Sequence, residues 1–277
     1  MIKYNKYKQR RIAVYDRYNA DDFWLSTGIT EEKTNQYVLH NHENVCEILF
    51  FLQGNSSFVV EGSEYPLSSE DFIIARHDEM HRVVHNAPCT YERVIINFDI
   101  AFFENNGCQE YAAAFFDRPA GSGNLFRAEN SRRAVDALHR LTLYIKEKAP
   151  ETLVRGVLCE VLRCISKRKE ATEGTASSVR LREIILYINE NLSGDLSLES
   201  ISSNFFISKY HLCRLFKTQT GMTVGQYVTA KRLLKADELH SSGMSLTDAA
   251  IASGFNDYSA YWHASRKQNV KKVLEKN

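Results

Sequence analysis

The sequence lacks a long apolar run, and its few cysteines lack the spacing of a pair. No stretch of its 277 residues reads as a membrane span, and the basic segment MIKYNKYKQRR at the start has no apolar run after it. The six cysteines are scattered without a Cys-x-x-Cys pair, which is typical of reduced thiols. These absences argue against a secreted or membrane protein, so we expect a cytoplasmic protein that does not contact a membrane.

The net charge is also small, but it is unevenly distributed. Lys and Arg number 35 against 34 Asp and Glu, a formal charge of +1 at pH 7. Thirteen of the basic residues and nine of the acidic ones lie from Ser178 onward, so this part carries +4 and the rest carries −3. Length and a hydrophobic content of 44% predict roughly two globular domains, and the basic C-terminal third indicates a polyanionic partner.

Short β-rich runs separated by turn residues fill the chain from about Tyr37 to Phe98. They include YVLH, CEILFFL, SSFVV, EYPL, DFIIA, RVV and YERVIINF. Such runs are rich in the β-branched and aromatic residues that strands favour. Their short, regular spacing predicts a small barrel or sandwich.

From about Ser131 the spacing of apolar residues becomes helical. One segment places Leu138, Leu141 and Ile145 on one face, and the next, after Pro150, does the same with Leu153, Val157, Val161 and Ile165. The second stripe is very apolar for a lone surface helix, so we predict a homodimer through residues 131–168. The alternative is that both helices pack only on the barrel. The polar, aperiodic residues 169–178 are expected to be a linker.

The part of the chain after this linker repeats itself. LSLESISSNFFISKYHLCRLFK, from Leu196, aligns with MSLTDAAIASGFNDYSAYWHASRK, from Met244, at an offset of 48 over a first helix and 49 over a second. Ser197 or Ser245 can cap the first helix, and Ser208 or Asp257 can cap the second after a turn. This order predicts helix-turn-helix architecture twice.

The second helix of the first copy has two different faces. Leu212, Leu215 and Phe216 form an apolar stripe. Polar and aromatic side chains at i, i+3, i+4 and i+7 form another face: Tyr210, Cys213, Arg214 and Lys217. Arg bound bidentately to guanine is the commonest specific contact in the major groove, so Arg214 is the first candidate for reading a base. The alternative is an ordinary solvated helix face.

The segment ISKYHLCRLFKTQTGMTVGQYVTAKRLLKADELHSSGMSLTDAAIASGFNDYS resembles the signature of the AraC/XylS family of bacterial transcription regulators, over roughly residues 180–268. The resemblance implies that a long helix, Val224 to about His240, joins two units whose recognition helices enter adjacent major-groove segments of double-stranded DNA. It also implies the DNA-binding residues, carried over by position: Ser208, Tyr210, Cys213, Arg214 and Lys217 in the first copy, and Tyr258, Ser259, Trp262 and His263 in the second.

The second copy departs from the family pattern. It has Ser265 where the first has Phe216, His263 where the first has Arg214, and Val270 where the first has Gly221. Loss of a buried Phe destabilises a helix, and a neutral His lacks the donor fork of Arg. We therefore expect a weaker second reader with a partly frayed tail. The alternatives are that Trp262 turns inward to fill the gap, or that the end of the gene is frameshifted or truncated.

The N-terminal part resembles the cupin-like sensor domains of many members of this family. His40, His42 and Glu47 are spaced as in the first cupin metal motif, and His81 falls where the second motif has its own His. Several other motif positions differ: Thr34 in the first, and Glu70, Arg76, Asp78 and His85 in the second. We therefore predict that His40, His42, Glu47 and His81 bind an effector through hydrogen bonds, and we assign no metal, cofactor or catalytic residue. A divalent metal site and a vestigial cluster are the alternatives.

The predicted fold class is α+β with two domains. Residues 1–130 form a cupin-like β-barrel that senses a ligand, 131–168 a helical hairpin for dimerisation, 169–178 a linker, and 179–277 an all-α AraC-type domain with tandem helix-turn-helix units. The predicted function is sequence-specific transcription regulation, without enzyme activity, in response to a small molecule such as a sugar or other metabolite. RNA polymerase is a further candidate partner. The alternatives are a metal-dependent cupin enzyme with a DNA-binding appendage, and an adaptor whose helix-turn-helix units bind a protein.

Overall fold

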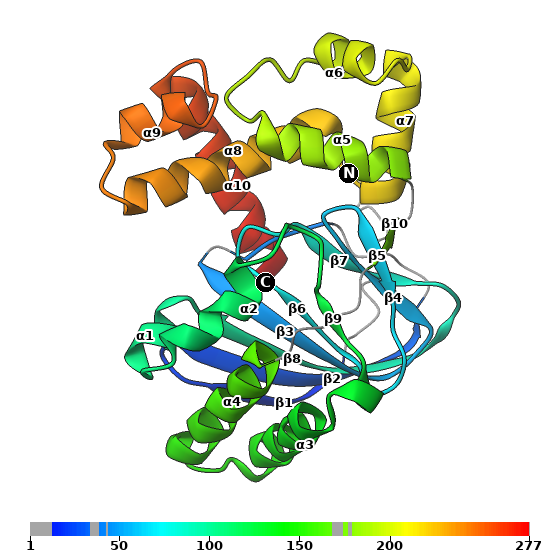
Figure 1. Cartoon of the computed structure of the whole chain (residues 1–277), viewed down its shortest axis with the longest axis vertical. Helices are drawn as coiled ribbons and strands as arrows, with labels where there is room; N and C mark the ends of the chain where they lie inside the picture. The colour runs from blue at the N-terminus through cyan, green and yellow to red at the C-terminus, as the bar shows by residue number, and fades with distance from the viewer. Residues whose placement is uncertain (1–12, 34–38, 43, 168–173, 177–178, 277) are drawn as a thin grey trace, which may run out of the picture. The chain divides into compact units, whose positions relative to one another are not determined.

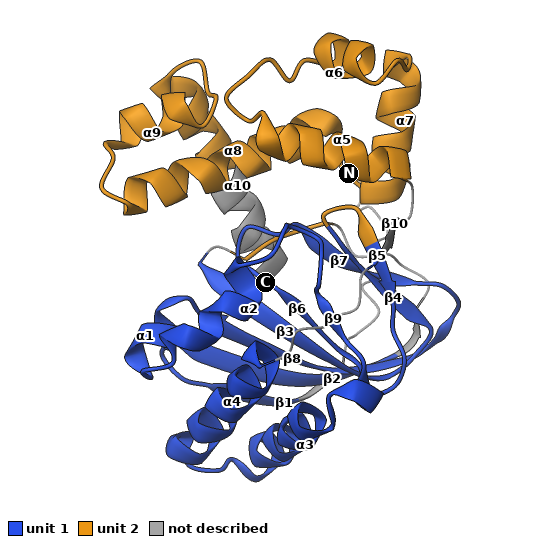
Figure 2. Cartoon of the chain, viewed as in Figure 1, with its two compact units in different colours: residues 1–37, 44–60, 64–174 blue, residues 38–43, 61–63, 175–277 orange. Residues whose placement is uncertain are grey.

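A computed structural model describes the chain outside residues 1–12, 34–38, 43, 168–173, 177–178 and 277 (Figure 1). The chain forms two compact units: residues 1–37, 44–60 and 64–174 in the first, and 38–43, 61–63 and 175–277 in the second (Figure 2). The first is built mainly from antiparallel sheets and the second from helices. The predicted α+β class with two domains is therefore confirmed. Among the described residues, no helix is long and apolar enough to cross a membrane.

The strands form two antiparallel sheets. The six-stranded sheet runs in the order β1 (Ala13–Asn19), β2 (Phe23–Lys33), β8 (Cys89–Asp99), β3 (Val45–Gln53), β6 (Phe72–Ala75) and β9 (Leu125–Phe126). In the other sheet, β5 (Ser63–Pro66), β4 (Ser56–Val60) and β7 (His81–His85) are consecutive neighbours. Strands β1 and β2 were not predicted, because they precede the β-rich runs that begin at about Tyr37. Much of the predicted run YVLH lies outside the described residues.

Strand β3 shows why a continuous apolar run occurs in an antiparallel sheet. Ile48 and Phe50 pack in a core shared with helices, whereas Leu49 and Phe51 pack with side chains from both sheets, such as Phe58 and Tyr91. Successive side chains of a strand point to opposite faces, so a strand covered on both faces can carry consecutive apolar residues, as β3 does from Ile48 to Leu52. The six-stranded sheet therefore separates a barrel interior from a second core beneath the helices.

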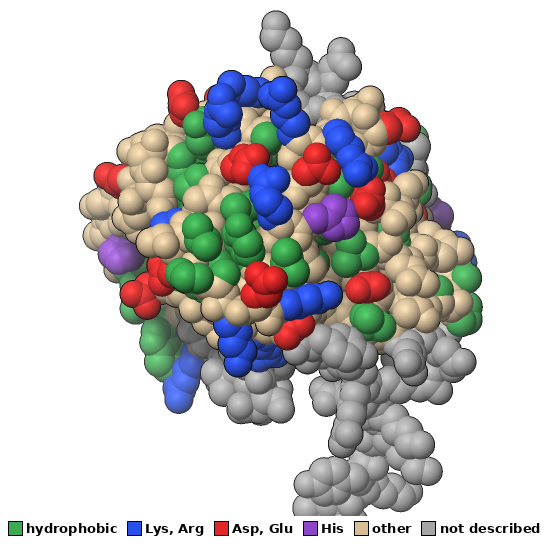
Figure 3. Space-filling view, turned by 90° about the horizontal axis from the view of Figure 1, so that it is seen from below, with side chains coloured by type: hydrophobic (Ala, Val, Ile, Leu, Met, Phe, Trp, Pro, Cys, Tyr) green, Lys and Arg blue, Asp and Glu red, His purple; other side chains and the backbone are tan. Residues whose placement is uncertain are grey.

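The predicted helical hairpin consists of α3 (Arg132–Glu147) and α4 (Glu151–Ser166), with Pro150 at the start of α4. Proline suits this position because its missing N–H would have no partner inside the helix. Val161 and Ile165 of the predicted dimer stripe are buried within the chain, so they cannot serve as an uncovered apolar face. Leu153 of α4 is 49% exposed and Leu143 of α3 is 50% exposed. Figure 3 views the molecule from below, the side of α3 and α4 in Figure 1, and shows apolar side chains scattered among charged ones.

Short helical segments between the sheets and the hairpin were not predicted. They are α1 (Ala101–Asn105), η1 (Gln109–Ala112), α2 (Ala113–Phe116) and η2 (Ala128–Asn130). Phe102, Phe103 and Phe115 from this region are buried, and their rings meet Phe98 of β8 edge-on at 5.5–5.7 Å. These aromatic contacts join β8 to the helices of the first unit.

The second unit contains the predicted tandem arrangement. After the two-residue strand β10 (Thr175–Ala176) come α5 (Val179–Glu190), α6 (Leu198–Asn204), α7 (Lys209–Thr220), α8 (Val224–Ser241), α9 (Leu246–Ala252) and α10 (Tyr258–Lys276). Helices α6 and α7 form the first helix-turn-helix, α9 and α10 the second, and α8 joins them. Most of the predicted linker lies outside the described residues.

Candidate nucleic-acid interface and effector site

Side-chain caps fix the start of the second helix in each helix-turn-helix unit. Ser208 Oγ accepts a hydrogen bond from His211 N at 3.2 Å at the start of α7. Asp257 Oδ1 accepts one from Ala260 N at 2.7 Å at the start of α10. These bonds satisfy N–H groups that have no partner inside the helix. Both caps predicted for the second helices are present, and Ser208 acts within the protein as a cap.

Helix α7 has the two faces that its sequence indicates. Leu212 and Phe216 are buried, and the Phe216 ring meets Tyr227 of α8 at 5.4 Å. The predicted contact residues, Tyr210, Cys213, Arg214 and Lys217, are all exposed. The Arg214 guanidinium lies 5.9 Å from the centre of the Tyr210 ring, within range of a cation–π contact. The helix therefore presents a cationic and aromatic surface on the side away from its packed stripe.

Lys217 has an additional structural partner near the end of α7. Its ammonium group donates to Gly221 O at 2.6 Å, and Gly221 ends the helix in the left-handed conformation with φ 77°. A cation at this position also complements the negative end of the helix dipole. Lys217 thus has a role at the helix end besides the one predicted from its position.

The predicted residues of α10 also lie on its exposed side. Tyr258, Ser259, Trp262 and His263 are exposed, with Trp262 at 43%. The Trp262 ring meets His263 at 5.2 Å and has the Arg266 guanidinium 5.1 Å from its centre. The alternative in which Trp262 turns inward is therefore wrong.

Tyr261 holds α10 on the core in place of Trp262. It is 7% exposed, its ring meets Phe255 at 5.7 Å, and both pack with Leu233 of α8. Tyr261 was not predicted to be a core residue, although at the offset of 49 it corresponds to the buried Leu212 of the first copy. Ser265, which replaces Phe216, is only half-buried. Helix α10 continues to Lys276 through the tail that was expected to fray.

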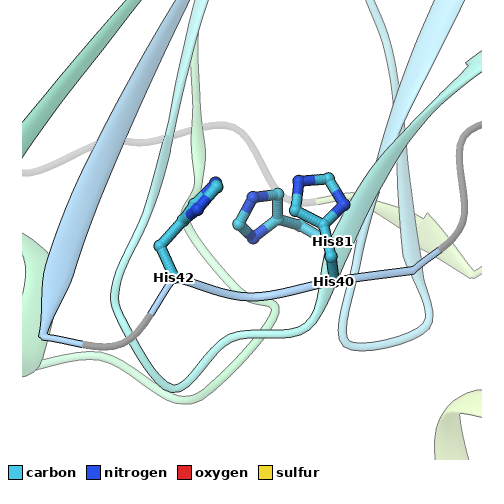
Figure 4. A group of neighbouring side chains, drawn as sticks. All are labelled: His40, His42 and His81. Carbon is cyan, nitrogen blue, oxygen red and sulfur yellow. The ribbon is translucent and has the colours of Figure 1, made fainter. Parts of the chain in front are cut away.

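The structure brings together the four residues predicted to bind an effector. His40 and His42 come from the segment between β2 and β3, their rings 5.1 Å apart and edge-on, and His81 opens β7 (Figure 4). One nitrogen of each of these three imidazoles lies within 4.8 Å of the others. Glu47 of β3 adds a carboxylate oxygen 3.9 Å from His81 Nε2.

The chemistry of the three histidines fits a metal site. Three imidazole nitrogens this close together suit a divalent transition-metal ion. His81 Nδ1 lies 2.9 Å from Glu79 O, so a proton on Nδ1 leaves Nε2 as the ligand atom. An ion held by His40, His42 and His81 would supply an electrophilic contact for an anionic or hydroxylated ligand.

A buried ion pair that the sequence analysis did not identify lies beside His81. Glu79 is fully buried and accepts from both terminal nitrogens of Arg118 at 2.7 Å, from Gly121 N at 2.8 Å and from Asn124 Nδ2 at 3.1 Å. Burial alone would raise the pKa of Glu79, but the charge and hydrogen bonds of Arg118 hold that pKa below its usual value. Glu79 and Arg118 are 39 positions apart, and no local pattern links them.

A separate hollow lies on the first unit. It has a volume of about 300 Å³ and is lined by residues of several strands and of α3, among them Asp16, Glu92 and Lys146. None of the four predicted effector residues lines it. The hollow and the histidine cluster are therefore different sites.

Two helix-turn-helix units joined by one helix define the class of this protein as a DNA-binding transcription regulator. Known proteins agree with this class. A family described as "Helix-turn-helix domain" matches residues 201–269. The match and the regulators named below show that this part of the chain is a helix-turn-helix domain similar to that of AraC-family transcription regulators.

Named relatives extend over most of the chain. The uncharacterized HTH-type transcriptional regulator YfiF of Bacillus subtilis is 24% identical over 239 residues, which are 80% of this chain and 74% of YfiF. The HTH-type transcriptional activator RhaS of Klebsiella pneumoniae is 22% identical over 250 residues, 86% of this chain and 88% of RhaS. Among solved structures, ToxT from Vibrio cholerae aligns with a TM-score of 0.41 and 11% identity, covering 88% of this chain and 93% of ToxT.

Proposed function

We propose that this AraC-family protein reads specific DNA sequences through α7 and α10, and that a small molecule bound at the histidine cluster changes this binding. The observation that carries the proposal is the two-faced form of α7. Its buried Leu212 and Phe216 fix the helix, while Tyr210, Cys213 and Arg214 remain exposed. A recognition helix needs this combination because its side chains must reach base edges from a fixed backbone.

The two readers differ in the contacts that they can make. Arg214 of α7 can donate two hydrogen bonds to one guanine, whereas α10 offers Tyr258, Trp262 and His263. The cations Arg266 and Lys267 on α10 are exposed and suit phosphate contacts. We therefore expect the first helix-turn-helix to contribute most of the sequence specificity and the second to add affinity.

A footprint of the purified protein on the DNA upstream of its own and neighbouring genes tests this proposal. Two protected major-groove segments about 10 bp apart are expected for each chain. Affinity should fall steeply as salt is raised, because Lys and Arg displace counterions from phosphates. Protection of one segment alone would restrict reading to α7. A protein that holds no DNA at any salt concentration would favour the adaptor function.

The effector proposal depends on the chemistry of His40, His42, Glu47 and His81. Imidazoles and a carboxylate can donate to and accept from hydroxyl groups, so sugars and related metabolites are suitable first candidates. The test is a panel of such compounds added to the DNA-binding assay. An effector should change the affinity or the half-site spacing, and the change should be lost in His42→Ala. Stoichiometric metal with turnover of a compound would instead favour the cupin enzyme.

We also propose a homodimer through residues 131–168. The buried residues of the α4 stripe weaken the first argument for it. Support comes from the exposed Leu143 of α3 and Leu153 of α4, and from Val157, which is partly exposed one turn after Leu153. Light scattering at micromolar concentration tests the dimer, and Leu143→Asp with Leu153→Asp should give a monomer. A monomeric mass for the unaltered protein would overturn it.

A further inference from the structure

Phe206 lies in the turn between α6 and α7, and two features make it unusual. Its φ of 53° is in the left-handed region, which bulky residues rarely adopt. Its side chain is 92% exposed. The backbone conformation of Phe206 is therefore unfavourable, and burial of its side chain does not offset this.

The second helix-turn-helix supplies an internal comparison. Phe206 N donates to Ser203 O at 3.2 Å, and Gly254 N donates to Ile251 O at 2.9 Å, each bond returning to the end of the preceding helix. At the offset of 48 these two residues correspond, and Gly254 has a φ of 101°. Glycine occupies this conformation without a clash of Cβ, so it is the ordinary residue for the position.

The position of Phe206 indicates what its ring can reach. It precedes Ser208, the cap of α7, by two residues, and the first turn of a recognition helix is the part that approaches base edges. Tyr210, one turn further on, is 77% exposed. Strain at a turn next to a binding surface points to a role in binding rather than in folding.

We propose that Phe206 contacts the 5-methyl group of a thymine in the segment read by α7. The inference rests on the proposed DNA binding and adds an apolar reader to it. The thymine methyl is the apolar group that base pairs present in the major groove, and Phe is suited to contact it. The turn would then read sequence before the helix begins.

The experiment uses the DNA segment protected in the footprint, with each thymine replaced in turn by uracil, which removes only the methyl group. One replacement should lower the affinity of the unaltered protein about fourfold, the size expected for burial of one methyl group. Phe206→Gly and Phe206→Ala should bind thymine and uracil forms of that site equally. Val179→Ala, which trims an exposed apolar residue elsewhere in the second unit, should discriminate as the unaltered protein does.

The two Phe206 variants separate the contact from the strain. Phe206→Gly should unfold at the same temperature as the unaltered protein or higher, because the left-handed strain is gone, whereas Phe206→Ala retains a Cβ. The inference is overturned if Phe206→Gly still distinguishes thymine from uracil. It is also overturned if this variant binds DNA as the unaltered protein does and fails only to activate RNA polymerase. Failure of the unaltered protein to bind any DNA would instead defeat the proposed function.

Discussion

Glu79 and Arg118 form a two-pronged ion pair, with both hydrogen bonds at 2.7 Å, around a carboxylate that is fully buried. The same carboxylate binds Gly121 N and Asn124 Nδ2, while the Glu79 carbonyl lies 2.9 Å from His81 Nδ1. The pair therefore connects the loop around residues 118–124 to the start of β7, where His81 lies.

Arg118→Leu should destabilise the first unit strongly. Removal of the guanidinium leaves the Glu79 charge buried and without its main counterion, a change that costs about 3–5 kcal/mol of unfolding free energy. Arg140→Leu is the matched control, because Arg140 pairs with Glu160 on the exposed surface and such pairs contribute about 0–1 kcal/mol. Urea unfolding measures both, and similar losses in the two variants would contradict the prediction.

The pH dependence of stability should carry the signature of Glu79. Its pKa is lower in the folded protein than in the unfolded chain, so its contribution is complete above the ordinary Glu pKa of about 4.3. That contribution is lost as the pH falls below this value and through the folded pKa. Between pH 7 and pH 3, the urea concentration at the midpoint of unfolding should therefore fall less steeply for Glu79→Gln than for the unaltered protein. Parallel curves for the two proteins would count against a depressed pKa.

Arg214→Ala should weaken binding to the specific site by about 1–3 kcal/mol and relax the preference at one guanine. Lys217→Ala provides the contrast: if Lys217 contacts phosphate, its loss lowers affinity for all sequences alike and reduces the salt slope by about 1. Both are measured by binding to a set of single-base variants of the footprinted site. An Arg214→Ala protein that discriminates among them normally would remove Arg214 as a reader.

Tyr261 and Trp262 are adjacent in α10 but should behave oppositely. Tyr261→Ala removes a buried ring from the core beneath α8 and should cost about 3–5 kcal/mol, as large aromatic truncations do. Trp262→Ala should leave the unfolding temperature nearly unchanged while weakening protection of the second DNA segment. Thermal unfolding and footprinting together check this pair. A large stability loss in Trp262→Ala would show that its ring packs inward.

Zinc can be used to probe the convergence of the histidines. We expect titration calorimetry to give one site per chain, weakened as the pH falls, because protonated imidazoles cannot bind a metal ion. His40→Ala and His42→Ala should each lower the affinity, whereas His139→Ala, which alters an exposed His paired with Glu70, should not. No heat above that of a triple His variant would exclude the metal site and leave the hydrogen-bonding and vestigial alternatives.

Local patterns in the sequence predicted much of this fold. The apolar run of β3, the helices on either side of Pro150 and the caps of α7 and α10 depend on neighbours within a few residues. Glu79 and Arg118 meet only through tertiary folding, so neither residue could be identified from its surroundings in the chain. The spacing of His40, His42, Glu47 and His81 was visible, but their convergence depends on how separate segments are placed.

The same distinction explains the errors in the helical part. The inward rotation of Trp262 was an alternative to its predicted DNA contact, because Trp262 sits beside the usual apolar positions, but the offset of 49 places Tyr261 in register with Leu212. Phe206 was not singled out because a φ value cannot be read from residue type. Correspondence with Gly254 was visible in the sequence, and it could have indicated a left-handed turn.

Gly254 also lies against α8 and against the segment between α5 and α6. A Cβ at Gly254 would be 2.1 Å from Leu192 O, and Arg232 of α8 donates to that same oxygen at 2.8 Å and to Gly194 O at 2.9 Å. Packing this close leaves the two helix-turn-helix units little freedom to slide or swivel against each other. The spacing between the two DNA segments that they contact is then fixed. Insertion of half a helical turn between these two segments would turn one of them to the far side of the duplex, and only bending or twisting of the DNA could bring it back.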